Sequence, residues 1–527
     1  MLFFGKRIKM IEYKNLQKIF QKRLFIMTIT GEPKKDTVAF ADFGKYENEV
    51  ITVKGTVHNI RMMSDFAFVI LRTARETIQC VYAESFSDYR MPPELKEECA
   101  VKVTGKVVAG ETRDGSKRYE LQIHDVEILS HPAAISPVVI TKKQVQCDLA
   151  TNLDYRPVTL RNPKERAVFK LQEGIQRGFR EYLTQQGFTE IHSPKINYAG
   201  AEGGTNVFKL DYFGKQVYLA QSPQLYKQAL VAAYERVFEI APVFRAEHHD
   251  TSRHLNEYIS MDFEMGFIDS FEDIMNMETG VLKYIMNLLK TEYKNEVDLL
   301  HIDIPEIKEI PVIKFMDAKE VLMKKFKYQP KDMKDFDPEE EQLLGKYAKK
   351  QFNSDFLFVT HYPSKKRPFY TMDDPADPEY TLSFDLLFRG LEITSGGQRV
   401  HDYEEQVAKM QKLGMDPEQF ETYLMLHKYG APPHGGLGLG LERLTMHLLG
   451  AKNVREATMF PRDINRVTPW RQATFYILRF ALDGQPFLNR FKNPFKEKPL
   501  FREGAPLKKS YLGHRPLLRT LREPLGK

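Results

Sequence analysis

A stretch of alternating charged and apolar residues, 243–267, constrains the fold of this chain more than any other feature. It reads VFRAEHHDTSRHLNEYISMDFEMGF. From Tyr258 onward, Ser260, Asp262 and Glu264 fall at every second position, with Ile, Met and Phe between them. Because successive side chains of a strand point to opposite faces, the alternation predicts a strand with one polar face and one core face.

The run before this strand has the same character. Glu239, Arg245 and Glu247 share one phase, while Phe238 and Phe244 fall in the other. We therefore expect two antiparallel strands with a common polar face, joined by the loop HHDTSRHL. Such a face can simply meet solvent. The cationic loop beside clustered acids instead favours a site that binds a phosphate chain.

Length and composition limit the class of protein. The 527 residues exceed the roughly 250 to 300 at which a single core stops growing, so more than one domain is expected. A net charge of +6, with 28% charged residues of both signs, permits a polyanionic partner without requiring one. Cys80, Cys99 and Cys147 lie far apart, which argues against a disulfide framework or a cysteine zinc site. No apolar run approaches the roughly 18 residues of a membrane span, so we expect a cytoplasmic protein without membrane contact.

Residues 37–133 carry a first predicted domain. Five short segments alternate as strands do: ITVKGTVHNI, FAFVILR, TIQCVYA, AVKVTGKVV and RYELQIHDVEIL. A five-stranded barrel with basic loops is typical of the OB fold, which binds single-stranded nucleic acid. Phe66 and Phe68 alternate with Ala67 and Val69, and the pattern leaves open which pair faces the core. The Pro-containing stretch within residues 134–162 predicts a linker.

Residues 163–469 carry a second, larger predicted domain. A helix over 163–187 ends at Gly187, a strand TEIHSPKI follows, and further strand-like runs alternate with helices, as in a mixed α+β domain. The charged stretch 328–350, inside an insertion of about 296–355, is interpreted as a helix with an exposed face. Residues 1–36 are interpreted as a basic extension, with an organellar transit peptide as the alternative. The tail 470–527 receives no role.

The segment SFDLLFRGLEITSGGQR predicts a hairpin with two acids on its polar face. A two-residue Arg-Gly turn would pair Leu387 with Glu392 and Asp385 with Thr394. Asp385 and Glu392 then become diagonal neighbours at roughly 7 to 8 Å. Two carboxylates at that separation can share one hard cation such as Mg²⁺ while phosphates complete its shell. Two solvated acids at a hairpin are the alternative.

The third motif, HGGLGLGLERL, brings glycines to the start of a helix that carries Arg443. It fits neither the dinucleotide fingerprint nor the phosphate-binding P-loop. Glycine allows the backbone to approach a flat ring or a phosphate, and an arginine can stack on one or pair with the other.

Together these motifs resemble those of the archaeal and eukaryotic type of aspartyl-tRNA synthetase, a class II aminoacyl-tRNA synthetase. EGGTNVF, QSPQLYKQ and SGGQRVHD extend the resemblance over residues 37–469. It implies an antiparallel class II sheet flanked by helices, an N-terminal OB domain for the anticodon, and a homodimer. The implied activity is ATP-dependent ligation of L-aspartate to tRNA(Asp) through aspartyl-adenylate, with charging of tRNA(Asn) left open.

The resemblance also implies residue roles. ATP would be bound by Arg245, Glu247, Arg253, His254, Leu255, Tyr258, Glu392, Gly440 and Arg443. Aspartate would be bound by Glu202, Gln224, Lys227, Arg245, Asp262, Ser395 and Arg399. Mg²⁺ would be held by Asp385, Glu392 and Ser395.

Within these sets the resemblance separates several tasks. Arg245 and Arg443 would be the catalytic residues. Arg245 would hold the α-phosphate and the substrate carboxylate, Arg443 would enclose the adenine together with Tyr258, and Arg253 and His254 would meet the terminal phosphates. The substrate carboxylate would then attack phosphorus directly, without a covalent enzyme intermediate.

Two other functions fit parts of the pattern. An asparaginyl-tRNA synthetase would share the ATP residues and differ in the side-chain pocket. Lys227 and Arg399 favour aspartate, because a carboxylate can pair with these cations and an amide cannot. A catalytically idle nucleic-acid-binding relative would lack the metal pair or the arginines, and Asp385 and Glu392 are both present.

Overall fold

The computed structural model describes residues 38–467 with four internal gaps, at 75, 87–89, 112–116 and 199–205. The basic extension and the C-terminal tail lie outside the described residues, so the interpretations given for them stay predictions. Within the described part, no helix is both long enough and apolar enough to cross a membrane.

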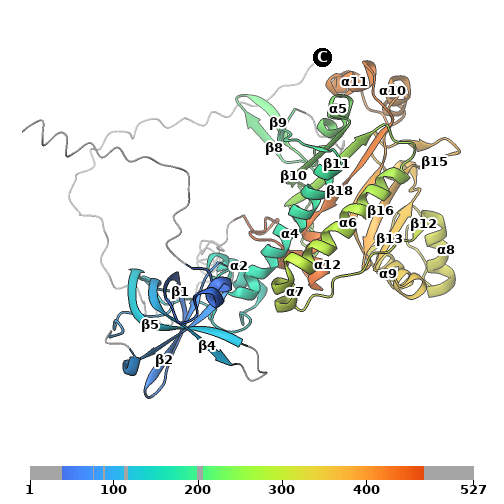
Figure 1. The fold of residues 1–527 in the computed structure, drawn as a ribbon. Coiled ribbons are helices and arrows are strands. Elements are labelled where there is room, and N and C mark those ends of the chain that lie inside the picture. The colour runs from blue at the N-terminus through green and yellow to red at the C-terminus, as the bar shows by residue number, and fades with distance from the viewer. Residues whose placement is uncertain (1–37, 75, 87–89, 112–116, 199–205, 468–527) are drawn as a thin grey trace, which may run out of the picture. The chain divides into compact units, whose positions relative to one another are not determined.

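The first domain is a closed five-stranded barrel with strand order β1-β2-β3-β5-β4 (Figure 1). Its strands are β1 (Val50–Met62), β2 (Phe66–Arg72), β3 (Thr77–Ala83), β4 (Ala100–Glu111) and β5 (Lys117–Ser130). The predicted OB barrel is confirmed. Ala67 and Val69 point into its core, so Phe66 and Phe68 lie half-buried on the outside, with their rings 5.1 Å apart.

The second domain is built on an eight-stranded sheet of order β12-β13-β16-β17-β18-β11-β10-β6. Its strands are β6 (Thr189–Glu190), β10 (Arg236–Phe244), β11 (Glu257–Gly266), β12 (Val312–Lys314), β13 (Phe356–Thr360), β16 (Ser383–Phe388), β17 (Leu391–Gln398) and β18 (His434–Gly440). Neighbours are antiparallel except at the two edges, where β12 pairs with β13 and β6 with β10 in parallel. The antiparallel sheet predicted for this domain is thus confirmed.

Helices and small sheets surround this central sheet. The helices are α2 (Leu149–Asp154), α3 (Arg156–Thr159), α4 (Pro163–Gln185), α5 (Gln224–Tyr234), α6 (Glu272–Glu292), α7 (Lys294–Leu300), α8 (Phe315–Phe326), α9 (Pro338–Phe352), α10 (Tyr403–Lys412), α11 (Glu421–Lys428) and α12 (Leu441–Leu449). The small strands are β7 (Ile196–Asn197), β8 (Lys209–Tyr212), β9 (Lys215–Leu219), β14 (Asp373–Asp374) and β15 (Asp377–Thr381).

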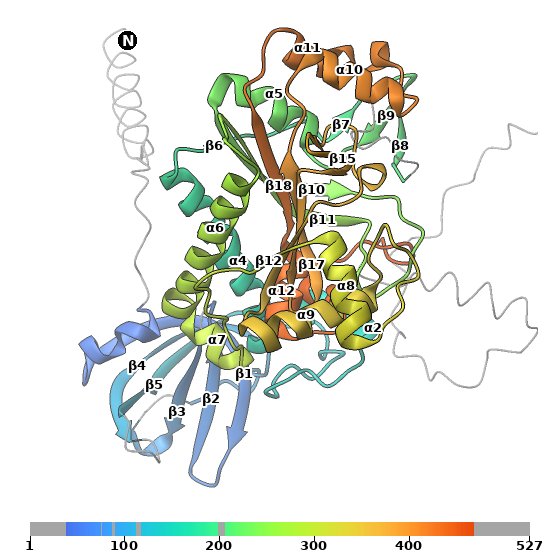
Figure 2. The ribbon, with the colours of Figure 1, turned by 90° about the vertical axis from the view of Figure 1, so that its right-hand side faces the viewer.

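Helices α4 and α6 cover one face of the large sheet, as Figure 2 shows. Asn162 caps α4 by accepting hydrogen bonds from the backbone N–H groups of Lys164 and Glu165, and Pro163 suits the first turn. Four apolar side chains of α4 are buried in the main core: Leu171, Ile175, Phe179 and Leu183. Met261, Phe263 and Met265 of β11 meet these helices, which leaves the opposite face of the sheet for polar side chains.

Two sequence predictions were wrong in detail. TEIHSPKI is not one strand, because it divides into β6 and β7, which belong to different sheets. Pro194 lies between them and has no N–H to donate to a ladder. The stretch 328–350 does contain a helix, α9, but its charges are not all exposed: Glu340 and Glu341 are buried. Helices α8 and α9 lie at the β12–β13 end of the sheet (Figure 2).

Candidate active site

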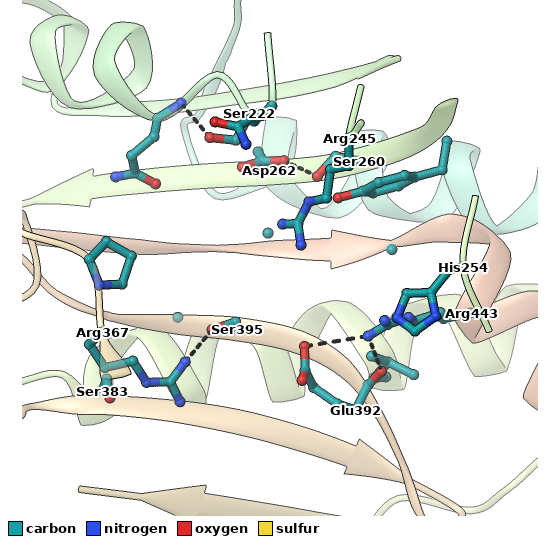
Figure 3. Close-up of a pocket in the computed structure, with 18 of the residues that line it drawn as sticks. Ser222, Arg245, His254, Ser260, Asp262, Arg367, Ser383, Glu392, Ser395 and Arg443 are labelled. Carbon is teal, nitrogen blue, oxygen red and sulfur yellow. Dashed lines mark hydrogen bonds and ion pairs between the residues drawn. The ribbon is translucent and has the colours of Figure 1, made fainter. Parts of the chain in front are cut away.

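A cavity of about 390 Å³ opens over the polar face of the large sheet. Fourteen residues predicted as site residues line it: Gln224, Lys227, Arg245, Glu247, Arg253, His254, Leu255, Tyr258, Asp262, Glu392, Ser395, Arg399, Gly440 and Arg443. Asp385 lies behind the lining, and Glu202 falls outside the described residues. Figure 3 shows the contributing strands side by side, with Glu392 and Ser395 on one of them.

Strands β10 and β11 pair as predicted, with Val243 opposite Tyr258 and Glu239 opposite Asp262. The alternation works as expected, because Tyr258, Ser260 and Asp262 line the cavity while Ile259 and Met261 between them pack in the core. The guanidinium of Arg245 lies 5.8 Å from the centre of the Tyr258 ring. This pair provides one wall on which a flat ring and a phosphate could both be held.

One end of the cavity holds a buried cluster of two cations and two carboxylates. Lys227 Nζ contacts Asp262 Oδ2 at 2.9 Å, Glu264 Oε2 at 3.3 Å and the Leu437 carbonyl at 2.8 Å. Arg399 Nε donates to Glu264 Oε1 at 2.8 Å. All four side chains are almost completely buried. Burial opposes ionisation of Glu264, but Arg399 and Lys227 outweigh it and hold the pKa of this carboxyl below its ordinary value.

This cluster changes the interpretation of the two cations. Each had been expected to face a substrate directly, yet Lys227 has three oxygen partners for its three N–H groups. Arg399 uses Nε and Nη2 for Glu264 and the Gly436 carbonyl, so among the described contacts Nη1 is the nitrogen available to a ligand. Glu264 is the compensating acid that the sequence prediction missed, although it has the same parity as Asp262.

The predicted hairpin is present, but its register differs by one residue. Leu387 pairs with Glu392 as expected, whereas Asp385 pairs with Ser395 rather than with Thr394. A β-bulge inserts an extra residue in β17, and a bulge moves the following side chains to the other face. It therefore turns Glu392 and Ser395 to the same side, where both line the cavity, and sends Thr394 into the core.

Asp385 is held by an arginine that the sequence prediction missed. Arg367 Nη2 lies 2.8 Å from Asp385 Oδ1. Arg367 Nη1 donates to Ser395 Oγ at 2.8 Å, as Figure 3 shows. The same guanidinium stacks 3.9 Å from the centre of the Tyr362 ring. Burial raises the pKa of Asp385 to about 6, an effect that Arg367 opposes and Glu392 increases. Arg367 lies in an irregular segment without sequence periodicity, so no pattern pointed to it.

The donors near this hairpin suit a hard cation. Asp385, Glu392 and Ser395 offer only oxygen atoms, which Mg²⁺ prefers, and phosphate oxygens of a substrate could complete such a shell. Among the described residues, no three His, Cys, Asp or Glu side chains gather closely enough to hold an ion by themselves. A metal ion here would therefore depend on a ligand that brings further oxygens.

Arg443 lies in the first turn of α12, directly after β18, and lines the cavity. Arg443 Nη1 donates to the Glu392 carbonyl at 3.0 Å and lies 3.5 Å from its carboxylate (Figure 3). The preceding residue, Glu442, accepts a hydrogen bond from the Ile259 backbone N–H, and this bond connects α12 to β11. A Cβ at Gly436 would lie 2.1 Å from the Phe263 carbonyl, so this glycine permits close strand packing rather than contact with a phosphate.

The loop between β10 and β11 holds the remaining predicted residues. Leu255 is buried, and His254 Nδ1 lies 2.6 Å from the Thr251 hydroxyl oxygen. Burial lowers the pKa of His254, and nearby Arg443 and Arg253 lower it further, against the opposing effect of Glu247. At neutral pH His254 is therefore a neutral hydrogen-bonding group rather than a cation.

Comparisons with known proteins agree with this geometry. A family model described as tRNA synthetases class II (D, K and N) matches residues 148–464, and one described as OB-fold nucleic acid binding domain matches residues 51–129. The chain is 45% identical to an aspartate–tRNA(Asp/Asn) ligase of Deinococcus radiodurans over 443 residues, covering 83% of this chain and 99% of the relative. It is 46% identical to the protein of the same name from Thermus thermophilus over 433 residues, covering 82% and 100%.

A solved structure is similar in its fold. The asparaginyl-tRNA synthetase of Pyrococcus horikoshii, complexed with asparaginyl-adenylate, superposes with a TM-score of 0.75 at 30% identity. The match covers 83% of this chain and all of that one.

Proposed function

Because the chain belongs to the class II tRNA synthetases of the D, K and N group, we propose that it joins L-aspartate to tRNA(Asp). The observation that carries this proposal is one cavity with two chemically different ends. One end holds the buried cluster of Lys227, Asp262, Glu264 and Arg399. The other end holds arginines beside the oxygen donors of β17.

In the first step, ATP and aspartate lie on the polar face of the sheet. Arg245 binds the α-phosphate and the α-carboxylate, which brings the attacking oxygen to phosphorus. Tyr258 and Arg443 enclose the adenine, Glu247 binds the adenine edge, and Arg253 meets the terminal phosphates. An oxygen of the substrate carboxylate bonds to the α-phosphorus, the bond to the β-phosphate oxygen breaks, and diphosphate leaves.

Catalysis in this step is positioning and charge stabilisation. Negative charge spreads over the phosphate oxygens in the transition state, and cations placed beside those oxygens stabilise it. Arg245 and Arg443 perform this task from opposite sides of the cavity. Mg²⁺ held by Glu392 and Ser395, with Asp385 behind them, would supply further neutralisation of the phosphate charge.

In the second step, a ribose hydroxyl of the terminal adenosine of tRNA attacks the carbonyl carbon of aspartyl-adenylate. The carbon–oxygen bond to the phosphate breaks, AMP leaves, and the ester to tRNA remains. No side chain becomes covalently bonded to the substrate in either step, because the nucleophiles are the aspartate carboxylate in the first step and the ribose hydroxyl in the second.

Selection of aspartate follows from the buried cluster. We assign Arg399 Nη1 to the β-carboxylate of the substrate. Lys227, held by Asp262 and Glu264, fixes the position of the buried cluster beneath it. Asparagine would present a neutral amide to Nη1 in place of a carboxylate, while Nε and Nη2 stay bound to Glu264 and the Gly436 carbonyl. Sites that hydrogen-bond one substrate group discriminate against an analogue lacking it by roughly 10⁴. This observation favours aspartate over the asparaginyl alternative.

The tRNA itself is proposed to contact the barrel through its outer aromatics, Phe66 and Phe68, on which bases can stack. Relatives at 45% and 46% identity are named for both tRNA(Asp) and tRNA(Asn), so we propose that tRNA(Asn) is also charged with aspartate. We further propose a cytoplasmic protein and, as the family resemblance implies, a homodimer; sedimentation of the full chain tests the assembly.

The test is amino-acid-dependent exchange of labelled diphosphate into ATP. Aspartate should support exchange, and asparagine should not. Charging of purified tRNA(Asp) and tRNA(Asn) with labelled aspartate then tests both nucleic-acid substrates. Equal exchange with asparagine would overturn the choice of substrate. If none of the amino acids supports exchange, the proposed reaction is wrong.

A further inference from the structure

Glu341, on the first turn of α9, lies in the charged stretch that the sequence presented as an exposed face, yet only 12% of its side chain is exposed. A carboxylate loses hydration when it is buried, and it is retained only where partners compensate. Its partners here come from two distant segments. Arg253 Nη2 donates to Glu341 Oε2 at 2.5 Å, and the backbone N–H of Glu392 donates to the same oxygen at 3.3 Å.

The first turn of α9 is fixed in place by hydrogen bonds and a buried ion pair. The Asp337 side chain accepts from the Glu340 N–H, and the Glu340 side chain accepts from the Asp337 N–H, which completes a capping box. Lys319, fully buried, donates to Glu340 Oε1 at 2.7 Å and to the carbonyls of Asp332 and Asp335. Glu341 follows directly on this network, so the position of its carboxylate is set by the helix.

The same turn of α9 is packed closely against the hairpin that carries Glu392. Gly390, in the turn between β16 and β17, has φ +79°, which favours glycine. A Cβ there would lie 2.8 Å from the Cα of Gln342, and a Cβ at Gly345 would lie 2.5 Å from the Gly390 nitrogen. Two glycines thus bring the helix and the hairpin into backbone contact, which places Glu341 beside the phosphate end of the cavity.

Arg253, in contrast, belongs to a loop. The backbone on its N-terminal side is anchored, since Ser252 O accepts the Val454 N–H at 2.8 Å and Thr251 O accepts from Arg455 at 3.0 Å. The long side chain of Arg253 has many rotamers and loses side-chain entropy on binding. Among the described residues, the partner of its guanidinium beyond the loop itself is Glu341, which it contacts through Nη2.

We propose that Glu341 is a positioning residue that holds Arg253 in the orientation needed for the terminal phosphates of ATP and for diphosphate. This inference rests on the proposed function. The guanidinium has five N–H donors, and Glu341 occupies one side of it, so Nε and Nη1 remain for phosphate oxygens. The insertion α8–α9 is then a structural support of the ATP site rather than a solvated addition.

The test uses the full chain with Glu341→Gln, which keeps the shape and removes the charge. Its matched control is Glu339→Gln, an exposed carboxylate on the same helical turn. Loss of a charge-assisted hydrogen bond should weaken binding of ATP, measured by calorimetry, by about tenfold, and raise KM for diphosphate in exchange by a similar factor. Binding of AMP, which lacks the terminal phosphates, should stay unchanged in Glu341→Gln. In the Glu339→Gln control, binding of both ATP and AMP should stay unchanged.

A second variant shows whether Glu341 acts through Arg253. In an Arg253→Ala background, Glu341→Gln should change ATP binding by less than about twofold, because the residue to be positioned is gone. Equal weakening of ATP and AMP, a full additive effect in that background, or tighter ATP binding would each overturn the proposal. Absence of aspartate-dependent exchange in the parent protein would instead overturn the proposed function, so the two failures are distinguishable.

Discussion

The two ends of the cavity differ in how their charges are arranged. At the amino-acid end, Lys227, Glu264 and Arg399 are at most 4% exposed and are bound to one another. At the phosphate end, Arg245 has 40% of its side chain exposed and Glu392 has 37%. Substrate choice thus depends on preformed contacts, whereas phosphate binding depends on side chains that solvent reaches. Changes at the first end should therefore affect stability and selection, and changes at the second should affect catalysis.

The largest expected effect comes from removing one charge of the buried cluster at the amino-acid end. Glu264→Gln leaves two buried cations with one carboxylate, and removing one partner of a buried pair costs about 3–5 kcal/mol. The matched control is Glu190→Gln, which breaks the exposed pair with Arg180 and should cost about 0–1 kcal/mol. Urea unfolding of the catalytic domain measures both. Equal shifts in the two variants would mean that the cluster is not the closed unit described.

At the phosphate end, Glu392→Gln should leave the unfolding midpoint unchanged and reduce adenylate formation by about 100-fold or more, because a charge at the oxygen-donor site is removed. Diphosphate exchange at ordinary magnesium concentration measures this loss. Glu379→Gln on exposed β15 serves as the control. Exchange retained at the parental rate would exclude Glu392 from metal and phosphate binding.

A buried carboxyl outside the cluster sharpens the comparison, because Glu278 of α6 has no cation beside it among the described residues. Burial raises its pKa from 4.5 to about 8, in contrast to the lowered pKa of Glu264. A raised pKa stabilises the fold below pH 4.5, and this contribution is lost as pH rises through 8. Glu278→Gln, always neutral, should gain about 1–3 kcal/mol over the parent between pH 5 and pH 9. A difference that stays constant with pH would contradict the raised pKa.

The smallest effect is expected outside the cavity. Replacing Phe66 and Phe68 by Ala should raise KM for tRNA by a factor that corresponds to about 1 kcal/mol, because base stacking on the outer barrel face is lost. Diphosphate exchange, which needs no tRNA, should stay at the parental rate in the same variant. Parallel loss of both activities would show that the substitution disturbs the fold instead.

Much of this site could be predicted from the sequence because strand alternation is strict. The parity of Tyr258 and Asp262 placed both side chains in the cavity, and the barrel followed from five alternating segments. The same parity included Glu264, but parity alone does not identify an ion-pair partner. Pairing is a property of tertiary packing, so its contacts with Lys227 and Arg399 had to be observed.

The remaining features had no local signal. The bulge in β17 moved Ser395 opposite Asp385, and bulges depend on the neighbouring strands rather than on the residues inserted. Arg367 comes from an irregular segment. Glu341 belongs to a charge run that is typical of solvent exposure, and its burial depends on tertiary contacts with the Gly390 hairpin and with Arg253.

The most direct test of the two-ended cavity is a pair of variants measured with both substrates in diphosphate exchange. Lys227→Leu should raise KM for aspartate by about 100-fold or more and leave binding of ATP within about twofold, which also verifies folding. Arg253→Leu should do the reverse, raising KM for ATP and leaving that for aspartate. If Lys227→Leu is silent, or if both variants shift both substrates equally, the division of the cavity into a selective end and a phosphate end is wrong.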